Sequence, residues 1–197
     1  MLPNKIILNL SKDEFYNTPT NLPKDLLLLE KISNIFEINW VEKNTKPYKK
    51  TIPTLEKYPH DIIITIDDDI NYPLDFVEKI YYKFLNSDRK NPVTSGTNMW
   101  WGVIYSHAGG YSLIKNEMFG IFLNDLYYNL VKDDYETFKF ADPIITYAIL
   151  LNNKKYIYTE NMNMTKIRKC THDNKNSLSQ IGTNKYKTIL QREHELI

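Results

Sequence analysis

The apolar positions near the N-terminus follow two different spacings. Residues 5–11 form a short run rich in isoleucine and leucine that gives way to polar residues, which predicts a buried strand. After two prolines, four apolar side chains recur at helical spacing: Leu26, Leu29, Ile32 and Phe36. Residues 36–41 can make a second strand. The pattern therefore predicts strand, helix and strand in that order.

The most hydrophobic strand of the pattern comes after a further short helix. Residues 48–58 predict that helix, which Pro53 interrupts or restarts because its ring cannot continue the hydrogen-bond ladder. Residues 61–66 are mainly β-branched with no polar alternation, as expected for a central strand covered on both faces. Pro73 and the acidic residues after it mark another helix start. Its buried stripe is expected at Leu74, Val77, Ile80 and Phe84.

The second half of the chain continues this alternation. A helix is indicated by Met118, Phe119, Phe122, Leu126 and Leu130, and another by Ile145, Ala148 and Ile149. Residues 156–158 predict a late strand, and the polar segment after residue 166 predicts a loop with a weak terminal helix. Alternating strands and helices indicate an α/β three-layer sandwich with a mainly parallel sheet. Because no repeat or linker interrupts the pattern, residues 1–197 are interpreted as a single domain.

Composition narrows the class of protein. With 25 basic and 24 acidic residues, the net charge of +1 provides no broad field for holding nucleic acid, so no nucleic-acid partner is expected. The single cysteine, Cys170, rules out an internal disulfide and fits a reducing compartment. The N-terminus shows no secretion signal, and the apolar runs are far shorter than the roughly 20 residues of a membrane span. We therefore expect a cytoplasmic protein, with peripheral membrane association through a partner left open.

The acidic run Asp67, Asp68 and Asp69 has the clearest chemical meaning. Three carboxylates after a buried parallel strand lie where open α/β sheets bind ligands. Adjacent carboxylates repel unless a cation lies between them, and Mg²⁺ or Mn²⁺ takes oxygen ligands while keeping positions for substrate phosphates. From composition alone, a solvated acidic turn that caps the next helix is an equal alternative. A calcium-binding EF-hand is excluded because its glycine and terminal glutamate are absent.

Residues 61–79 also resemble a known family. Their sequence, DIIITIDDDINYPLDFVEK, is similar to the strand, DxD motif and following helix of GT-A-fold glycosyltransferases, especially bacterial cell-surface polysaccharide enzymes. The resemblance extends to residues 5–15, which are similar to the family's second strand, and to residues 108–110 and 140–142. It implies a GT-A-like, Rossmann-like sandwich that binds a nucleotide sugar together with Mn²⁺ or Mg²⁺.

The resemblance implies roles for the acidic run and for two later residues. Asp69 is the most direct metal ligand, Asp67 contacts both the metal and the nucleotide, and Asp68 serves either role. Arg168 and His172 follow the last strand, where the family places groups that neutralise the departing diphosphate or complete the metal shell. For each of these two, an ordinary surface position is the alternative.

Asp142 is the catalytic base that the resemblance implies. Inverting members of the family carry a carboxylate before a late helix, where it deprotonates the acceptor hydroxyl. An aspartate followed by Pro143 is also a helix N-cap followed by a favoured first helical residue, and the two roles are compatible. Gly109 and Gly110 would let the backbone approach the donor or acceptor sugar closely, with a plain turn as the alternative.

The leading interpretation is metal-dependent transfer of a sugar from a nucleotide-diphosphate donor to a glycan or lipid-linked acceptor. GT-A enzymes usually have a strand, a loop and a helix before the element that residues 5–11 resemble, so the chain is expected to be N-terminally truncated. The alternative is accordingly a non-catalytic remnant that serves as a binding or assembly module. An aspartyl phosphatase of the HAD type is disfavoured, because Asn71 stands where that pattern needs threonine or valine. The pattern leaves the sugar, the base and the oligomeric state open.

Overall fold

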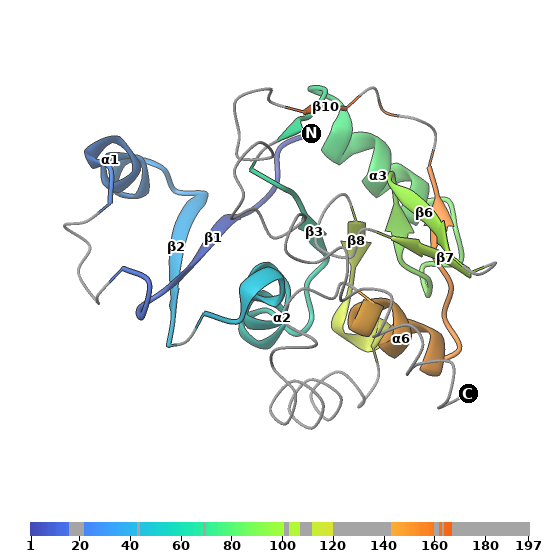
Figure 1. The fold of residues 1–197 in the computed structure, drawn as a ribbon. Coiled ribbons are helices and arrows are strands. Elements are labelled where there is room, and N and C mark those ends of the chain that lie inside the picture. The colour runs from blue at the N-terminus through green and yellow to red at the C-terminus, as the bar shows by residue number, and fades with distance from the viewer. Residues whose placement is uncertain are drawn as a thin grey trace.

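The computed structural model describes the chain over residues 1–15, 22–42, 44–68, 70–100, 103–106, 112–119, 143–159, 162 and 164–166. Helices and strands alternate along these residues, which is the mixed α/β architecture that the sequence pattern predicts (Figure 1). No helix within these ranges has the length and apolar character that crossing a membrane requires.

The N-terminal part forms strand, helix and strand, as predicted. Strands β1 (Ile6–Ser11) and β2 (Phe36–Val41) pair in parallel over their full length, and helix α1 (Lys24–Ile32) lies in the crossover between them. The helix ends because Ser33 adopts an extended backbone conformation. The Ser33 hydroxyl then accepts the backbone N–H of Phe36 at 3.2 Å, so Phe36 begins β2 instead of extending the helix.

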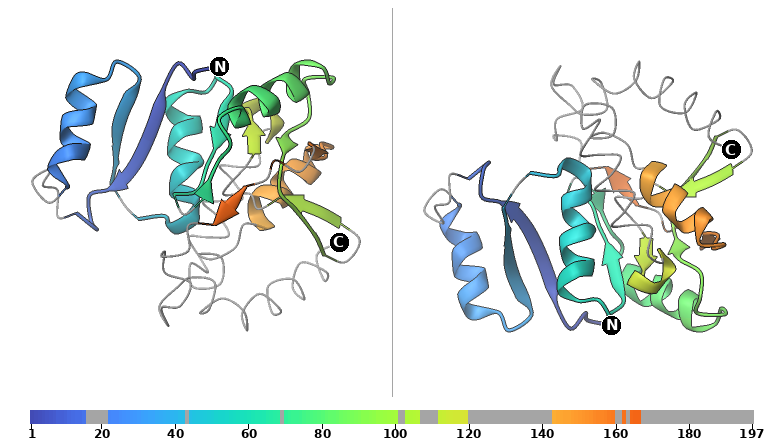
Figure 2. Two further views of the ribbon diagram at one scale, coloured as in Figure 1. Left: turned by 90° about the horizontal axis from the view of Figure 1, so that it is seen from above. Right: turned by 90° about the horizontal axis from the view of Figure 1, so that it is seen from below.

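Helix α1 forms where the helical spacing predicts it, but none of its residues is buried. Leu29 is 42% exposed and Ile32 is 70% exposed, whereas Leu26 and Phe36 at the same spacing are partly buried. Both views in Figure 2 place α1 beyond β2, on the side away from β1. The Glu30 carboxylate accepts the backbone N–H of Ile38 at 2.9 Å, which anchors the helix to β2. Because α1 lies beyond the outer strand of the pair, it has little surface to pack against.

The segment between β2 and the next strand forms two short helices. The 3₁₀ helix η2 (Lys46–Lys50) precedes helix α2 (Ile52–Lys57), which confirms that the helix restarts near Pro53. Pro53 is tolerated because it lies in the first turn of α2, where a backbone N–H has no partner within the helix. Ile52 and Leu55 point into the main core, so α2 connects the β1–β2 pair to the rest of the molecule.

A four-stranded sheet forms the centre of the molecule. Its order is β3-β8-β5-β9, with β3 Ile63–Thr65, β8 Ser112–Ile114, β5 Val93–Thr94 and β9 Ile157–Tyr158. Strand β8 runs antiparallel to both β3 and β5, and only β5 and β9 are parallel. The sheet is therefore mixed, whereas the sequence favoured a mainly parallel one. The late strand that the sequence predicted is confirmed as β9.

Helix α3 (Phe76–Leu85) packs on this sheet and begins later than the predicted stripe. Its buried residues are Phe76, Ile80 and Phe84, one turn apart. Leu74, which was expected in the stripe, is fully exposed, because the chain makes a turn after Pro73 and the helix begins only at Phe76. The predicted α3 stripe was thus correct at Ile80 and Phe84, Val77 packs partly buried against the core, and only Leu74 was wrong.

The remaining elements complete the core and the surface. Helix α6 (Pro143–Leu151) buries Ile145, Ala148 and Ile149, as predicted, and the 3₁₀ helix η3 (Asn116–Met118) contributes the buried Met118. Two antiparallel strand pairs are added: β4 Ile70–Asn71 with β10 Thr165–Lys166, and β6 Thr97–Trp100 with β7 Val103–Ser106. The rest of the helix expected over 118–130, and the terminal helix, lie outside the described residues.

Candidate functional site

The acidic run begins two residues after β3, at the carboxyl end of this strand. Figures 1 and 2 place β3 between the β1–β2 pair and β8. The Asp67 side chain is 25% exposed, and Asp68 is exposed. Asp69 lies outside the described residues. The acidic run thus follows a strand, as predicted. In the described sheet, however, β3 is an edge strand that runs antiparallel to β8, and Ile62 to Ile64 are only partly buried, so the expectation of a central strand covered on both faces was wrong.

An ion pair joins the acidic run to the end of η2. The Lys50 ammonium donates to Oδ1 of Asp67, and the Lys50 side chain is 33% exposed. Both groups remain partly exposed, so solvent screens the ion pair and its net stabilisation is small. One of the carboxylates in the acidic run therefore has its charge balanced by a lysine from another element.

The backbone of the acidic turn is held by an aromatic side chain. The N–H of Asp67 donates to the hydroxyl of Tyr72 at 2.7 Å. The Tyr72 ring packs against Phe76, with ring centroids 4.6 Å apart, and Phe76 is only 2% exposed. Because Phe76 belongs to the first turn of α3, the start of this helix fixes the turn that presents Asp67.

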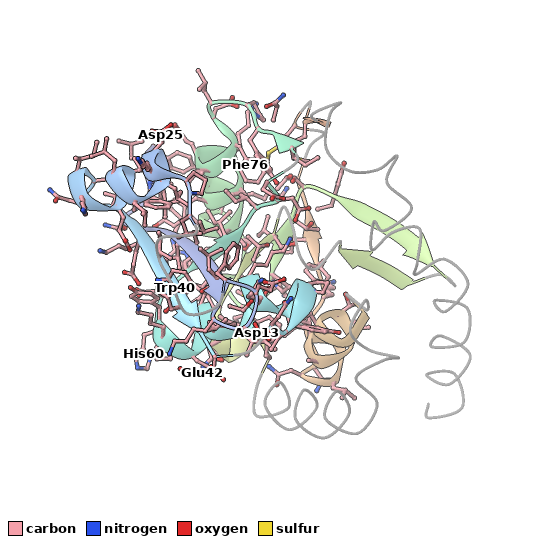
Figure 3. The ribbon with its side chains drawn as sticks, turned by 60° about the vertical axis from the view of Figure 1, so that its left-hand side comes forward. Asp13, Asp25, Trp40, Glu42, His60 and Phe76 are labelled. Carbon is pink, nitrogen blue, oxygen red and sulfur yellow. The ribbon has the colours of Figure 1, made fainter. Side chains whose placement is uncertain are left out.

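A second polar cluster lies beyond the carboxyl ends of β1 and β2. The Lys49 ammonium lies 2.5 Å from Oε2 of Glu14 and 3.5 Å from Oγ of Ser11. The backbone N–H of Asn44 donates to Asp13 at 3.0 Å, and this hydrogen bond holds the pKa of Asp13 below its usual value. Figure 3 shows Asp13 and Glu42 at the same end of the strand pair. Adjacent residues Lys49 and Lys50 therefore connect this cluster to the acidic run.

Strand pairing brings a distant segment to the acidic run. Lys166 of β10 lies opposite Ile70 of β4, and Thr165 lies opposite Asn71. Ile70 directly follows Asp69 in the sequence, so Thr165 and Lys166 lie beside the two residues that follow the acidic run. Strand β10 is thus brought next to the acidic run by the backbone topology.

Several predicted site residues lie outside the described part of the chain: Asp69, Gly109, Gly110, Asp142, Arg168 and His172. Asp142 directly precedes the start of α6 at Pro143, which is the sequence position that both the catalytic and the capping interpretation require. Among the residues that are described, no group of three or more His, Cys, Asp or Glu side chains is arranged to hold a metal ion. The described part of the site is therefore Asp67 and Asp68 with their neighbours.

Two residues of this site were not found from the sequence. Lys50 was assigned only to a helical segment, and Tyr72 only to the connection before the next helix. A lysine that reaches a carboxylate 17 residues away gives no local signal, because the contact depends on how η2 sits against β3. The position of Tyr72 shortly after the acidic run could have suggested a turn held by its hydroxyl.

Comparison with known proteins adds no assignment to this geometry. No protein-family model, no curated protein and no solved structure matches the chain.

Proposed function

We propose that the chain transfers a sugar from a nucleotide-diphosphate donor to a hydroxyl of a glycan or lipid-linked acceptor, in the manner of GT-A glycosyltransferases. The observation that carries the proposal is the acidic turn after β3. Its backbone is fixed by Tyr72, and its first carboxylate faces the basic end of η2. Anionic and cationic side chains at the carboxyl edge of a strand suit a ligand that brings both a divalent cation and a diphosphate.

The chemistry of the acidic run fits Mn²⁺ or Mg²⁺. Carboxylate oxygens are the ligands that these hard cations prefer, and Asp67 already attracts a positive charge in the structure. In this proposal Asp67 and Asp69 hold the cation, His172 completes its shell, and Asp68 contacts the nucleotide. When bound, the cation supplies positive charge that stabilises the diphosphate as a leaving group.

The transfer itself uses groups of the chain. Asp142 takes the proton of the acceptor hydroxyl as the acceptor oxygen bonds to the anomeric carbon of the sugar. At the same time, the bond from that carbon to the diphosphate oxygen breaks, and the diphosphate leaves with the bonding pair. Arg168 neutralises part of the charge on this leaving group. The backbone at Gly109 and Gly110 allows the sugar to approach closely.

The role of Asp142 is tested by Asp142→Asn. Asparagine keeps the shape of aspartate and much of its capping ability but is not a base. Sugar transfer should fall about 10²–10⁴-fold, while donor binding and the melting temperature stay nearly unchanged. Loss of a helix cap would instead cost about 1 kcal/mol of stability. Transfer by Asp142→Asn at the parent rate would show that the base is elsewhere. A parent protein that transfers no sugar from any donor would favour the non-catalytic module.

A further inference from the structure

Lys50 is placed where it serves the acidic run and no other carboxylate of the described residues. It is the last residue of η2, and its ammonium donates to Oδ1 of Asp67. The two side chains are 33% and 25% exposed, so the pair remains open to solvent on one side. A partly exposed ion pair of this kind is weak enough to exchange partners.

The fold fixes the backbones on both sides of this pair. The carbonyl oxygen of Lys50 accepts hydrogen bonds from Asn9 at 3.5 Å and from the Thr54 hydroxyl at 3.2 Å. On the other side, the backbone N–H of Asp67 is held by the Tyr72 hydroxyl at 2.7 Å. Only the flexible stem of the lysine has to move for the ammonium to leave the carboxylate. The backbones on both sides of the ion pair are therefore held in place, and only the Lys50 side chain needs to move to break it.

The adjacent residue, Lys49, has a different partner from Lys50. Lys49 directs its ammonium to Glu14 and Ser11, at the end of β1. Two neighbouring lysines of one 3₁₀ helix thus serve different carboxylates. Lys49 is consequently a matched control for Lys50, with the same charge, the same element and a different partner.

We propose that Lys50 exchanges between two anionic partners: the Asp67 carboxylate in the free chain and the diphosphate of the bound donor. This inference rests on the proposed function, because it takes Asp67 as a ligand of the divalent cation. Lys50 and the cation compete for the Asp67 carboxylate, because this single negative charge cannot fully balance both positive charges at once. A displaced ammonium remains beside the cation, where the negatively charged diphosphate is attracted by both charges.

The test uses the full chain and two simple probes, Mn²⁺ alone and inorganic pyrophosphate. Mn²⁺ binding is followed by electron paramagnetic resonance or calorimetry for the parent, Lys50→Gln, Lys50→Arg and Lys49→Gln. Removing the competing charge in Lys50→Gln should tighten Mn²⁺ binding by about tenfold. In the presence of saturating Mn²⁺, the same variant should bind pyrophosphate about tenfold more weakly. Lys50→Arg and Lys49→Gln should both behave like the parent within about twofold.

Each outcome decides the inference. Equal Mn²⁺ affinity in Lys50→Gln and the parent, an equal gain in Lys49→Gln, or no Mn²⁺ binding by any variant would overturn it. If Lys50→Gln does not fold, Lys50→Met, which keeps the apolar stem, takes its place with the same expected shifts. These probes contain no sugar and no nucleoside. A protein that shows the predicted exchange but binds no nucleotide sugar would retain this role of Lys50 and lose the proposed transferase function.

Discussion

Polar side chains join α2 to the β1–β2 pair. Asn9 donates to the Thr54 hydroxyl at 2.7 Å, and Asn39 donates to Asn9 at 2.7 Å. Nearby, Glu37 of β2 accepts hydrogen bonds from the Lys57 ammonium and from the Tyr58 hydroxyl. The buried contact between Asn9 and Thr54 demands one orientation of its partners, because any other arrangement leaves a buried group without its hydrogen bond. They therefore set how η2 and α2 lie against β1.

The Glu37 contacts make a prediction about pH. The hydrogen bond from Lys57 holds the pKa of Glu37 below its ordinary value of 4.5, with a further contribution from Tyr58. A lowered carboxyl pKa adds stability above the unfolded pKa, and that stability is lost as pH falls through the folded value. Glu37→Gln should lower the free energy of unfolding by about 1 kcal/mol near neutral pH. Urea unfolding should show this difference shrinking below pH 4.5.

The contact between Glu37 and Lys57 also has an upper pH limit for its contribution to stability. The hydrogen bond to Glu37 raises the pKa of Lys57, so the contribution persists through neutral pH and is lost only as pH rises through that raised value. A loss in Glu37→Gln that is as large in acid as at neutral pH would mean that packing, and not charge, is responsible.

Among the elements, α1 and α3 show how one hydrophobic pattern can have two outcomes. Both carry apolar side chains at helical spacing, and the stripe on α3 was expected to be buried. Helix α3 lies on the sheet and buries Ile80 completely, whereas α1 lies beyond β2 and leaves Ile32 70% exposed. Spacing indicates which residues share a face of a helix. It carries no information on whether another element covers that face.

The same substitution on both helices tests this difference. Ile80→Ala should lower the free energy of unfolding by about 2–5 kcal/mol, because it removes methyl groups from a closed core. Ile32→Ala should change it by about 0.5 kcal/mol or less, since most of that side chain already contacts water. Urea denaturation midpoints at equal slopes measure both. A comparable loss in the two variants would show that α1 is covered in solution.

For the whole molecule, local elements were predictable and their pairing was not. Strands β1 and β2 match their predicted bounds closely, because the apolar run at the start of β1 and the alternation of apolar and polar residues in β2 are local signals. Antiparallel pairing of β3 with β8 places Thr65 opposite Ser112. The sequence of neither segment predicts this partner. The same holds for Lys166 beside Ile70.

The candidate site follows the same division. The position of Asp67 and Asp68 after a strand was predicted from the run of β-branched residues before them. Lys50 and Tyr72 entered the site only through tertiary contacts, which local spacing does not encode. The sequence pattern thus located the acidic run. Only the fold shows that Tyr72 holds its backbone and that Lys50 balances the charge of Asp67.

The central claim is that the acidic run binds a nucleotide sugar through a divalent cation. The most direct test measures binding of a panel of nucleoside diphosphates and nucleotide sugars to the full chain, with and without Mn²⁺, for the parent and Asp69→Ala. The account predicts saturable binding by the parent that requires Mn²⁺. It also predicts that Asp69→Ala loses this binding and keeps its melting temperature, because neighbouring carboxylates gain no stability from mutual repulsion. Absence of Mn²⁺-dependent binding in the parent, or unchanged Mn²⁺-dependent affinity in a folded Asp69→Ala variant, would contradict it.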